Sequence, residues 1–353
     1  RIVLFIFFIV WFLSDGVLSL LVDWTWFEAI NHLELFSTRI WTQALLWVGT
    51  FAAVFAFLFV NLRFASSVAS IDLRRLQDQM VDIEISVENT KYILVGLRWL
   101  AMVFPAFIFA NVVSDQWLYC LAFLEPVSFG QTDTLFGLDY SFYVFQLPMM
   151  DLFVAILKSI SILTLIIVAA QSFVRDVLLG KNGSQLHPKA QSHLSLLGAW
   201  TVLLFGVEWF LERYNLLFTK DGVVWGAGYA DVSARIPAYW IMIGVSVIVV
   251  IFLLEAARRK EYRLSTIALI GYVVTRILVV GIWPSIVQDY MVEPNELEVE
   301  KPFLKQNISA TRFAYALDRI SVEPFEASYD LSMEDIQNNP LTINNVRVWD
   351  DRP

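Results

Sequence analysis

Charged residues, cysteine and histidine are all scarce in this chain of 353 residues. Only 17% of the residues are charged and 58% are hydrophobic, so an ordinary water-soluble domain is excluded: that much apolar surface requires a bilayer or a very large core. The single cysteine, Cys120, excludes an intramolecular disulfide and a cysteine-based zinc site. The net charge of -9 excludes a nucleic-acid-binding protein, which must neutralise phosphates.

Long apolar windows dominate what remains. A hydrocarbon core about 30 Å thick requires roughly 20 apolar residues in a helix, and seven windows meet this length. We therefore predict an all-α membrane protein, a bundle of about seven transmembrane helices. Asp15 interrupts the first window, whereas the sixth carries no charge before Glu255. The windows are residues 2–22, 40–61, 92–113, 150–171, 192–212, 237–257 and 264–286.

The distribution of lysine and arginine predicts the orientation of the bundle. Three alternate loops hold eleven basic residues and the other three hold four, and basic loops are retained in the cytoplasm. The N-terminus is then cytoplasmic, and an odd number of spans places residues 292–353 outside. We predict a transmembrane domain over residues 1–291, with a net charge of -3, and the start of an extracytoplasmic domain over residues 292–353, with a net charge of -6. The predicted location is the bacterial inner membrane or an equivalent internal membrane.

The segments outside the spans also carry patterns. Nine aromatic residues between Trp117 and Phe145 indicate an interfacial belt or a lid over the bundle; an aromatic ligand-binding cleft is the alternative. The mixed-charge stretch 66–89 favours an amphipathic helix. A helix over 302–317 and a strand over 343–349 would give the exported part an α/β character. Because the chain opens on an arginine and stops within a polar run, we expect it to be a piece of a longer protein.

Three long motifs identify a resemblance: FGLDYSFYVFQLP at 136–148, GVVWGAGYADVSARIPA at 222–238, and VEPNELEVEKPFLKQNISATRFAYALD at 292–318. Together they resemble uncharacterised protein family 0182, bacterial and cyanobacterial membrane proteins with no established activity. The resemblance implies about seven N-terminal spans, a long exported C-terminal domain, and a structured junction between the two. The motif residues that we associate with that junction are Gly226, Gly228, Asp231, Arg235, Pro294, Asn295 and Glu296.

Catalytic patterns are missing from the sequence. It contains no nucleophile elbow, no phosphate-binding loop and no H-E-x-x-H motif, so we predict no catalytic, cofactor-binding or metal-binding residues and do not expect an enzyme. The glycines Gly226 and Gly228 are interpreted as turn formers. His187 and His193 are interpreted as residues of a solvated loop. Four glutamates between Glu293 and Glu300 form a solvated acidic face, with a divalent-cation site as the alternative.

Four charged side chains fall within the predicted spans: Arg98, Lys158, Glu208 and Arg276. An uncompensated charge at the centre of a bilayer costs at least about 2.5 to 3.5 kcal/mol, so each must face protein or water. At about 1.5 Å per residue, Lys158 lies about 12 Å and Glu208 about 6 Å below the same membrane surface, and we predict that the two pair. Arg276 lies near mid-membrane, and we expect it to face an internal polar cavity or backbone carbonyls.

Two main functions are compatible with these features. The first is a scaffold or accessory subunit that anchors an exported domain in a larger membrane complex, with membrane lipids and other membrane-protein subunits as partners. The alternative is a transporter or channel for a small solute or lipid-like molecule, with Arg276 and the Lys158–Glu208 pair along the route. A membrane enzyme whose active site lies beyond residue 353 is a third interpretation.

The predicted ion pair is testable by a double-mutant cycle of Lys158→Met and Glu208→Gln. Because the two charges compensate each other away from water, we expect a coupling of about 0.5 to 3 kcal/mol in the free energy of unfolding, measured in detergent or nanodiscs. Strictly additive effects of the two substitutions would show that the residues do not pair.

Overall fold

The structure is a computed structural model that describes residues 2–67, 87–173, 186–220, 225–324 and 330–346. Within these ranges the chain is almost entirely helical, and the described residues form no strand, only one isolated antiparallel bridge between Thr132 and Asp139. The α-helices are α1 (Ile2–Ala29), α2 (Leu33–Ser67), α4 (Val87–Asp115), α5 (Trp117–Leu124), α6 (Leu147–Phe173), α7 (Pro188–Asn215), α8 (Ile236–Arg259), α9 (Tyr262–Arg276), α10 (Trp283–Val287), α11 (Glu296–Ala314), α12 (Met333–Asn338) and α13 (Pro340–Asn344).

Short segments of wider or tighter helix interrupt the long helices. Four π-helical segments occur among the described residues: η1 (Phe142–Gln146), η4 (Asp231–Arg235), η5 (Ile277–Ile282) and η6 (Gln288–Val292). Three 3₁₀ segments are η3 (Leu216–Phe218), η7 (Glu293–Asn295) and η8 (Leu317–Arg319). A π-helical turn widens the helix and releases the regular hydrogen-bond register, and such turns are frequent at functional sites.

Six described helical stretches are long and apolar enough to cross a membrane. They coincide with predicted windows two to seven, which confirms an all-α protein of the membrane-spanning type. The first window lies within α1, which is not among the six; the seven-span count therefore stays a prediction. The six stretches are Leu33–Ser66, Val95–Asp115, Phe142–Phe173, Pro188–Phe218, Asp231–Arg259 and Arg263–Ala314.

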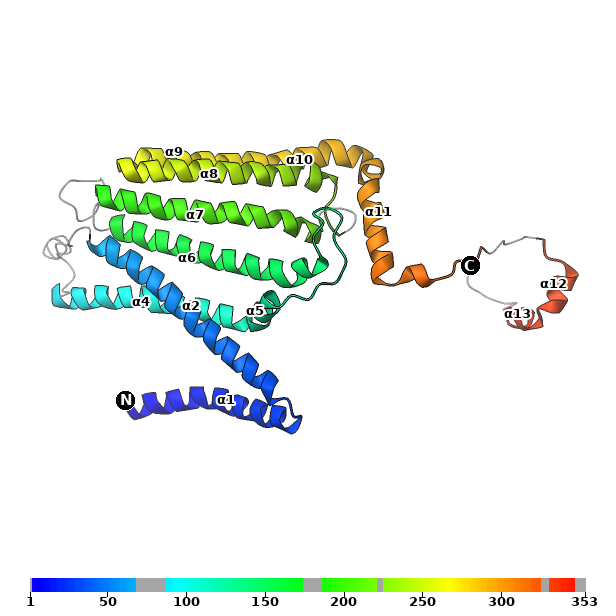
Figure 1. Ribbon diagram of the computed structural model, residues 1–353, viewed down its shortest axis with the longest axis horizontal. Coiled ribbons are helices and arrows are strands. Elements are labelled where there is room, and N and C mark those ends of the chain that lie inside the picture. Colours follow the sequence, from blue (N-terminus) through cyan, green and yellow to red (C-terminus); the bar gives the residue numbers. More distant parts are fainter. Residues whose placement is uncertain (1, 68–86, 174–185, 221–224, 325–329, 347–353) are drawn as a thin grey trace, which may run out of the picture. The chain divides into compact units, whose positions relative to one another are not determined.

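The chain divides into two compact units, residues 1–304 and 305–353. In the first, α6, α7, α8 and α9 lie side by side in chain order, and α2 packs on both α4 and α6 (Figure 1). Helix α7 is the most enclosed, with half of its apolar window buried, and it packs most extensively on α8. The first unit is therefore a helix bundle with α7 at its centre.

The α7–α8 interface is built from a small residue and a group of aromatic side chains. A Cβ added at Gly206 would lie 3.1 Å from the Cβ of Ser246, so glycine allows the two helices to approach closely. One turn along α7, the Trp209 ring stacks on Tyr239 at 5.5 Å, and its Nε1 donates to the Tyr272 hydroxyl at 2.9 Å. The apolar ring of Trp209 is buried, and its polar N–H has a hydrogen-bond partner, so neither part of the side chain is left in an unfavourable environment.

His193 is not in a solvated loop, as the sequence analysis assumed. Helix α7 begins at Pro188 with His187 as its N-cap, so His193 lies inside the helix and is 8% exposed. Its Nε2 lies 3.0 Å from Oδ1 of Asn61 on α2, and its ring packs on Phe64. A polar side chain such as that of His193 is compatible with burial inside a helix because it finds a hydrogen-bond partner.

The second unit contains the end of the acidic tail. The predicted helix over 302–317 is confirmed in large part by α11, which begins six residues earlier and carries Pro302 inside it. The predicted strand over 343–349 is wrong at its start: Ile343 and Asn344 end helix α13, while 347–349 lie outside the described residues. A short α12 with a Ser332–Asp335 capping box precedes it, and these local hydrogen bonds satisfy the backbone without a partner strand. Most of the predicted amphipathic helix at 66–89 also lies outside the described residues.

The close approach of α7 and α8 predicts a difference between two glycines. Gly206→Leu is expected to lower the free energy of unfolding by about 1 to 3 kcal/mol, because the added side chain overpacks the interface at Ser246. Gly244→Leu is the matched control, since an added Cβ there meets nothing within 4 Å. Thermal unfolding in detergent measures both. Equal destabilisation by the two variants would contradict this account of the interface.

Candidate functional site

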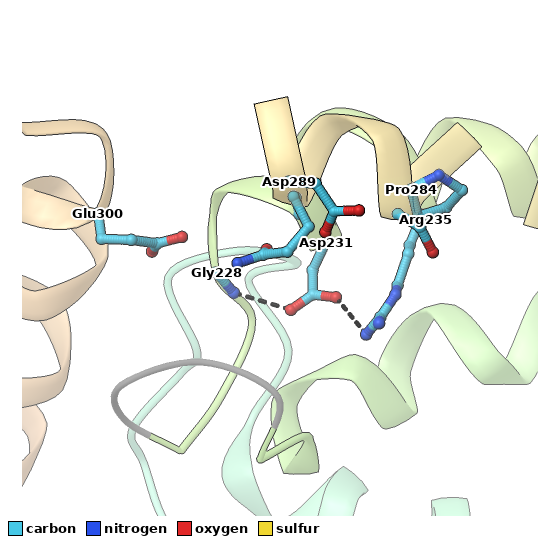
Figure 2. A pocket seen from close by; sticks show the side chains of 9 residues that line it. Gly228, Asp231, Arg235, Pro284, Asp289 and Glu300 are labelled. Carbon is cyan, nitrogen blue, oxygen red and sulfur yellow. Dashed lines mark hydrogen bonds and ion pairs between the residues drawn. The ribbon is translucent and has the colours of Figure 1, made fainter. Parts of the chain in front are cut away.

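The described part of the junction motif, residues 225–238, forms a hydrogen-bonded corner where α8 begins. Asp231, the first residue of η4, is 6% exposed, and its Oδ2 accepts from the backbone N–H of Gly228 at 2.9 Å. Its Oδ1 accepts from Nη1 of Arg235 at 2.8 Å. Figure 2 shows the Asp231 carboxylate between these two donors. Asp231 and Arg235, the first and last residues of η4, therefore form a partly buried ion pair.

Gly226 ties the same loop to the end of α7. Its φ is 113°, a region that side chains with a Cβ rarely adopt, so glycine is required. Its N–H donates to the carbonyl of Thr219 at 2.9 Å, and the Thr219 hydroxyl donates to the Gly226 carbonyl at 3.1 Å. The prediction that this glycine forms a turn is confirmed, and the turn connects α7 with α8.

Glu300 reaches the corner from the second turn of α11. Its Oε1 accepts from the backbone N–H of Tyr229 at 2.9 Å. A Cβ at Gly228 would lie 3.0 Å from the same oxygen, so the glycine also provides room for the carboxylate. Figure 2 shows Glu300 pointing from its helix toward Gly228. From the sequence, Glu300 is one of four glutamates of a solvated acidic face or a divalent-cation site. Its partner is 71 residues away, and no local pattern indicates such a contact.

A pocket of about 130 Å³ lies at this corner. It carries three carboxylates and one guanidinium, together with amide, hydroxyl and backbone groups. Asp289 on η6 and Pro284 on α10 close the side opposite Glu300 (Figure 2). The lining residues are Gly228, Ala230, Asp231, Arg235, Pro284, Ser285, Gln288, Asp289 and Glu300. Among the described residues, no three His, Cys, Asp or Glu side chains are grouped so as to hold a metal ion.

The remaining motif residues lie beside the pocket rather than in it. Pro294 and Asn295 belong to η7, Glu296 begins α11, and all three are exposed. Asn295 Nδ2 donates to Glu298 Oε2 at 2.8 Å, a side-chain contact across the first turn of α11. Three lining residues, Ser285, Gln288 and Asp289, were not identified from the sequence, because they follow the last apolar window without a distinctive spacing.

The structure brings Lys158 and Glu208 together as an ion pair between α6 and α7, the pairing that the sequence predicts. The ammonium group also lies 5.2 Å from the centre of the Phe205 ring. Two carboxylates that the sequence analysis missed lie on the same pair of helices. Asp151 accepts from Asn215 Nδ2 at 3.0 Å, and Glu212 is one helical turn from Glu208.

The other two charges in the spans are placed differently. Arg276 is exposed, and its guanidinium carbon lies 5.8 Å from the centre of the Trp209 ring. An aromatic face therefore takes the place of the internal cavity or backbone carbonyls that we expected. Arg98 is partly exposed on α4 and takes part in none of these contacts.

Two carboxylates organise the loop between α5 and α6. Asp133 accepts from the backbone N–H groups of Leu135, Phe136 and Leu138 at 2.6 to 2.8 Å and from the Tyr143 hydroxyl at 2.7 Å. Asp139 accepts from the Ser128 hydroxyl at 2.5 Å and from three further backbone N–H groups. The aromatic part of the loop packs on α6 and α7 through Tyr143, Leu147 and Leu211. This arrangement supports the lid interpretation over an open aromatic cleft.

The hydrogen bonds of the lid lower the pKa of both carboxyl groups. Burial alone would raise the pKa of Asp133, but the donors from Phe136, Tyr143, Leu138 and Leu135 outweigh it and hold the pKa below its ordinary value of 3.8. The Ser128 hydroxyl, followed by the backbone N–H groups of Ser141 and Phe129, holds the pKa of Asp139 well below its ordinary value. Each carboxylate therefore stabilises the folded lid at pH values above the ordinary value, and this contribution is lost as the pH falls through the folded-state pKa.

The lid is expected to loosen in acid. Hydrogen exchange of the peptide 125–146 should be constant above about pH 5 and should increase, after correction for intrinsic rates, as the pH falls below about 4. Asp139→Asn should speed exchange at neutral pH and flatten this dependence, because the neutral amide accepts the same donors more weakly. Asp115→Asn, at the exposed end of α4, is the control. A wild-type profile retained in the Asp139 variant would refute the role of that carboxylate.

A helix bundle with membrane-length apolar helices, internally paired charges and structured connections at its ends defines a multi-pass membrane protein. The chain belongs to the uncharacterised protein family UPF0182, whose family model matches residues 1–353. The sequence resemblance is therefore confirmed.

Curated relatives share about a third of the residues. A UPF0182 protein of Trichodesmium erythraeum is 32% identical over 98% of this chain, and one of Desulforamulus reducens is 31% identical over 95%. A UPF0182 protein of Cupriavidus necator is 30% identical over 96% of the chain. The chain spans 37% to 38% of the length of these relatives. No solved structure matches it.

Proposed function

We propose that this chain is the membrane domain that anchors and positions the exported part of a UPF0182 protein, as a scaffold or accessory subunit of a larger membrane complex. The observation that carries the proposal is the contact of Glu300 with the Gly228–Tyr229 backbone. Through it, the first turns of α11 are attached to the end of the bundle.

The corner that receives Glu300 is itself held from two sides. Thr219 and Gly226 connect it to α7, and the Asp231–Arg235 bridge connects it to α8. A carboxylate that accepts a backbone N–H in such a pre-arranged corner forms a charge-assisted hydrogen bond, which is both strong and directional. This hydrogen bond therefore holds the first turns of α11 against the corner.

The length of the relatives supports an anchoring role. This chain covers 37% and 38% of the length of two relatives, so most of each relative lies outside the matched region. Polar groups in the described bundle are largely paired with one another, as expected for a structural domain. Transport of a small solute is the second candidate, and the charged side chains of Asp151, Lys158, Glu208 and Glu212 along α6 and α7 favour it.

Glu300→Gln in the full-length protein tests the anchoring role. Losing a charged acceptor is expected to raise protease cleavage after α11 about tenfold while the bundle stays folded, since hydrogen bonds to charged groups contribute about 1.5 to 3 kcal/mol. It should also reduce the amount of companion protein that co-purifies from the native membrane. Glu296→Gln, an exposed residue one turn earlier in α11, is the matched control.

Three outcomes would contradict the proposal. Unchanged cleavage in Glu300→Gln would show that the contact does not position the segment. Equal effects of Glu296→Gln and Glu300→Gln would show that the corner is irrelevant. A wild-type protein that purifies reproducibly alone, and that a small solute stabilises, would favour transport instead.

A further inference from the structure

Arg213 is a buried cation in the last turn of α7. The residue is 5% exposed, and its Nε donates to the carbonyl of Phe210 at 3.1 Å. The Tyr214 side chain is both a hydrogen-bond partner and an electrostatic partner of the guanidinium, but Nη2 has no hydrogen-bond partner among the described residues. A buried charged N–H group without an acceptor is unfavourable, so this nitrogen identifies a position where an acceptor would bind.

Three aromatic rings surround the guanidinium. Its central carbon lies 4.0 Å from the ring centre of Phe210, 4.1 Å from that of Trp240 and 5.2 Å from that of Tyr214. Their faces attract the cation, and cation–π attraction is strongest where water is excluded. The rings hold the guanidinium in place but offer Nη2 no acceptor. The site is therefore rigid, positively charged and incompletely paired.

The site lies at the end of the bundle, where the polar headgroups of a bilayer would meet it. Helix α7 has 28 residues and is about 42 Å long, which exceeds a hydrocarbon core of about 30 Å. Its last turn, with Arg213, then falls in the headgroup region. Phe210 and Trp240 are 40% and 51% exposed, so the rings that cover the guanidinium face outward from α7 and α8.

We propose that Arg213, with Phe210 and Trp240, binds the phosphate group of a membrane lipid. A planar guanidinium presents N–H donors in the geometry that phosphate oxygens accept, and aromatic rings at the headgroup level pack against the glycerol and upper acyl chain. The proposal requires the half-exposed Trp240 side chain to turn aside so that the phosphate reaches the buried Nη2. The phosphate then supplies the acceptor that the protein does not.

A second cation–π pair at the same end of the bundle is a matched control. Nζ of Lys220 lies 3.8 Å from the centre of the Trp225 ring, but both residues are exposed. Water already satisfies an exposed ammonium group. If lipid binds because the guanidinium is buried and incompletely paired, Arg213 binds it and Lys220 does not. If anions are simply attracted to positive charge, both residues contribute.

The test uses the full-length protein in nanodiscs of digalactosyl diacylglycerol, an uncharged lipid without phosphate, to which phosphatidylglycerol is added in steps. Native mass spectrometry measures the phosphatidylglycerol retained per protein. Arg213→Gln is expected to weaken retention about tenfold and Lys220→Gln to leave it unchanged. Arg213→Lys keeps the charge but not the planar set of donors, so its phosphatidylglycerol retention should lie between those of the wild type and Arg213→Gln. This variant replaces Arg213→Gln in the test if the glutamine variant fails to fold.

The outcomes separate a lipid from a free anion. Retention that is equal in wild type and in both Arg213 variants would overturn the proposal, as would an equal loss in Lys220→Gln. In a separate experiment, inorganic phosphate is added to the detergent-solubilised protein and its thermal stability is measured. Thermal stabilisation of the wild type by inorganic phosphate as large as that by phosphatidylglycerol would overturn the assignment to a lipid, and stabilisation by phosphatidylglycerol alone would support it.

Discussion

The cost of leaving a polar or charged group unpaired away from water is the constraint on which this structure depends. Within a bilayer, the backbone satisfies its own hydrogen bonds by forming helices, and charged side chains must find partners in the protein. Lys158 and Glu208 pair with each other, and Asn215 donates to Asp151. Arg276 lies over an aromatic ring. The polar contacts between α6 and α7 therefore set which faces of these helices meet.

The same constraint acts on the connections at the end of the bundle. Asp133 and Asp139 each collect several backbone N–H groups that a loop would otherwise leave to solvent. At the corner between α7 and α8, Asp231 accepts the backbone N–H of Gly228, and Glu300 accepts that of Tyr229. Carboxylates that accept backbone donors hold their segments in one conformation. In this family member, segments rich in motif residues are thus ordered by acidic side chains rather than by strands.

Much of the fold was predictable, because long apolar windows predict helices by length and composition alone. The Lys158–Glu208 pair was predictable from the depth of each residue below the membrane surface, because both lie in well-defined spans. Glu300 was not, because its partner is distant in sequence. The prediction that His193 lies in a loop was wrong, because a polar stretch resembles a loop when the sequence does not reveal its partner on another helix. Arg213 was counted only as a basic residue that indicates topology, since enclosure by aromatic rings requires knowledge of the neighbouring helix.

The π-helical segments of the final span have a mechanical consequence. In η5, six residues take up the wider turn just before Pro284, which has no N–H to donate. A second widened turn, η6, begins directly after α10, which is five residues long. A helix with two such turns has two points at which its axis can bend with little loss of backbone hydrogen bonding. A tilt of α9 can therefore be absorbed as curvature between Ile277 and Val292.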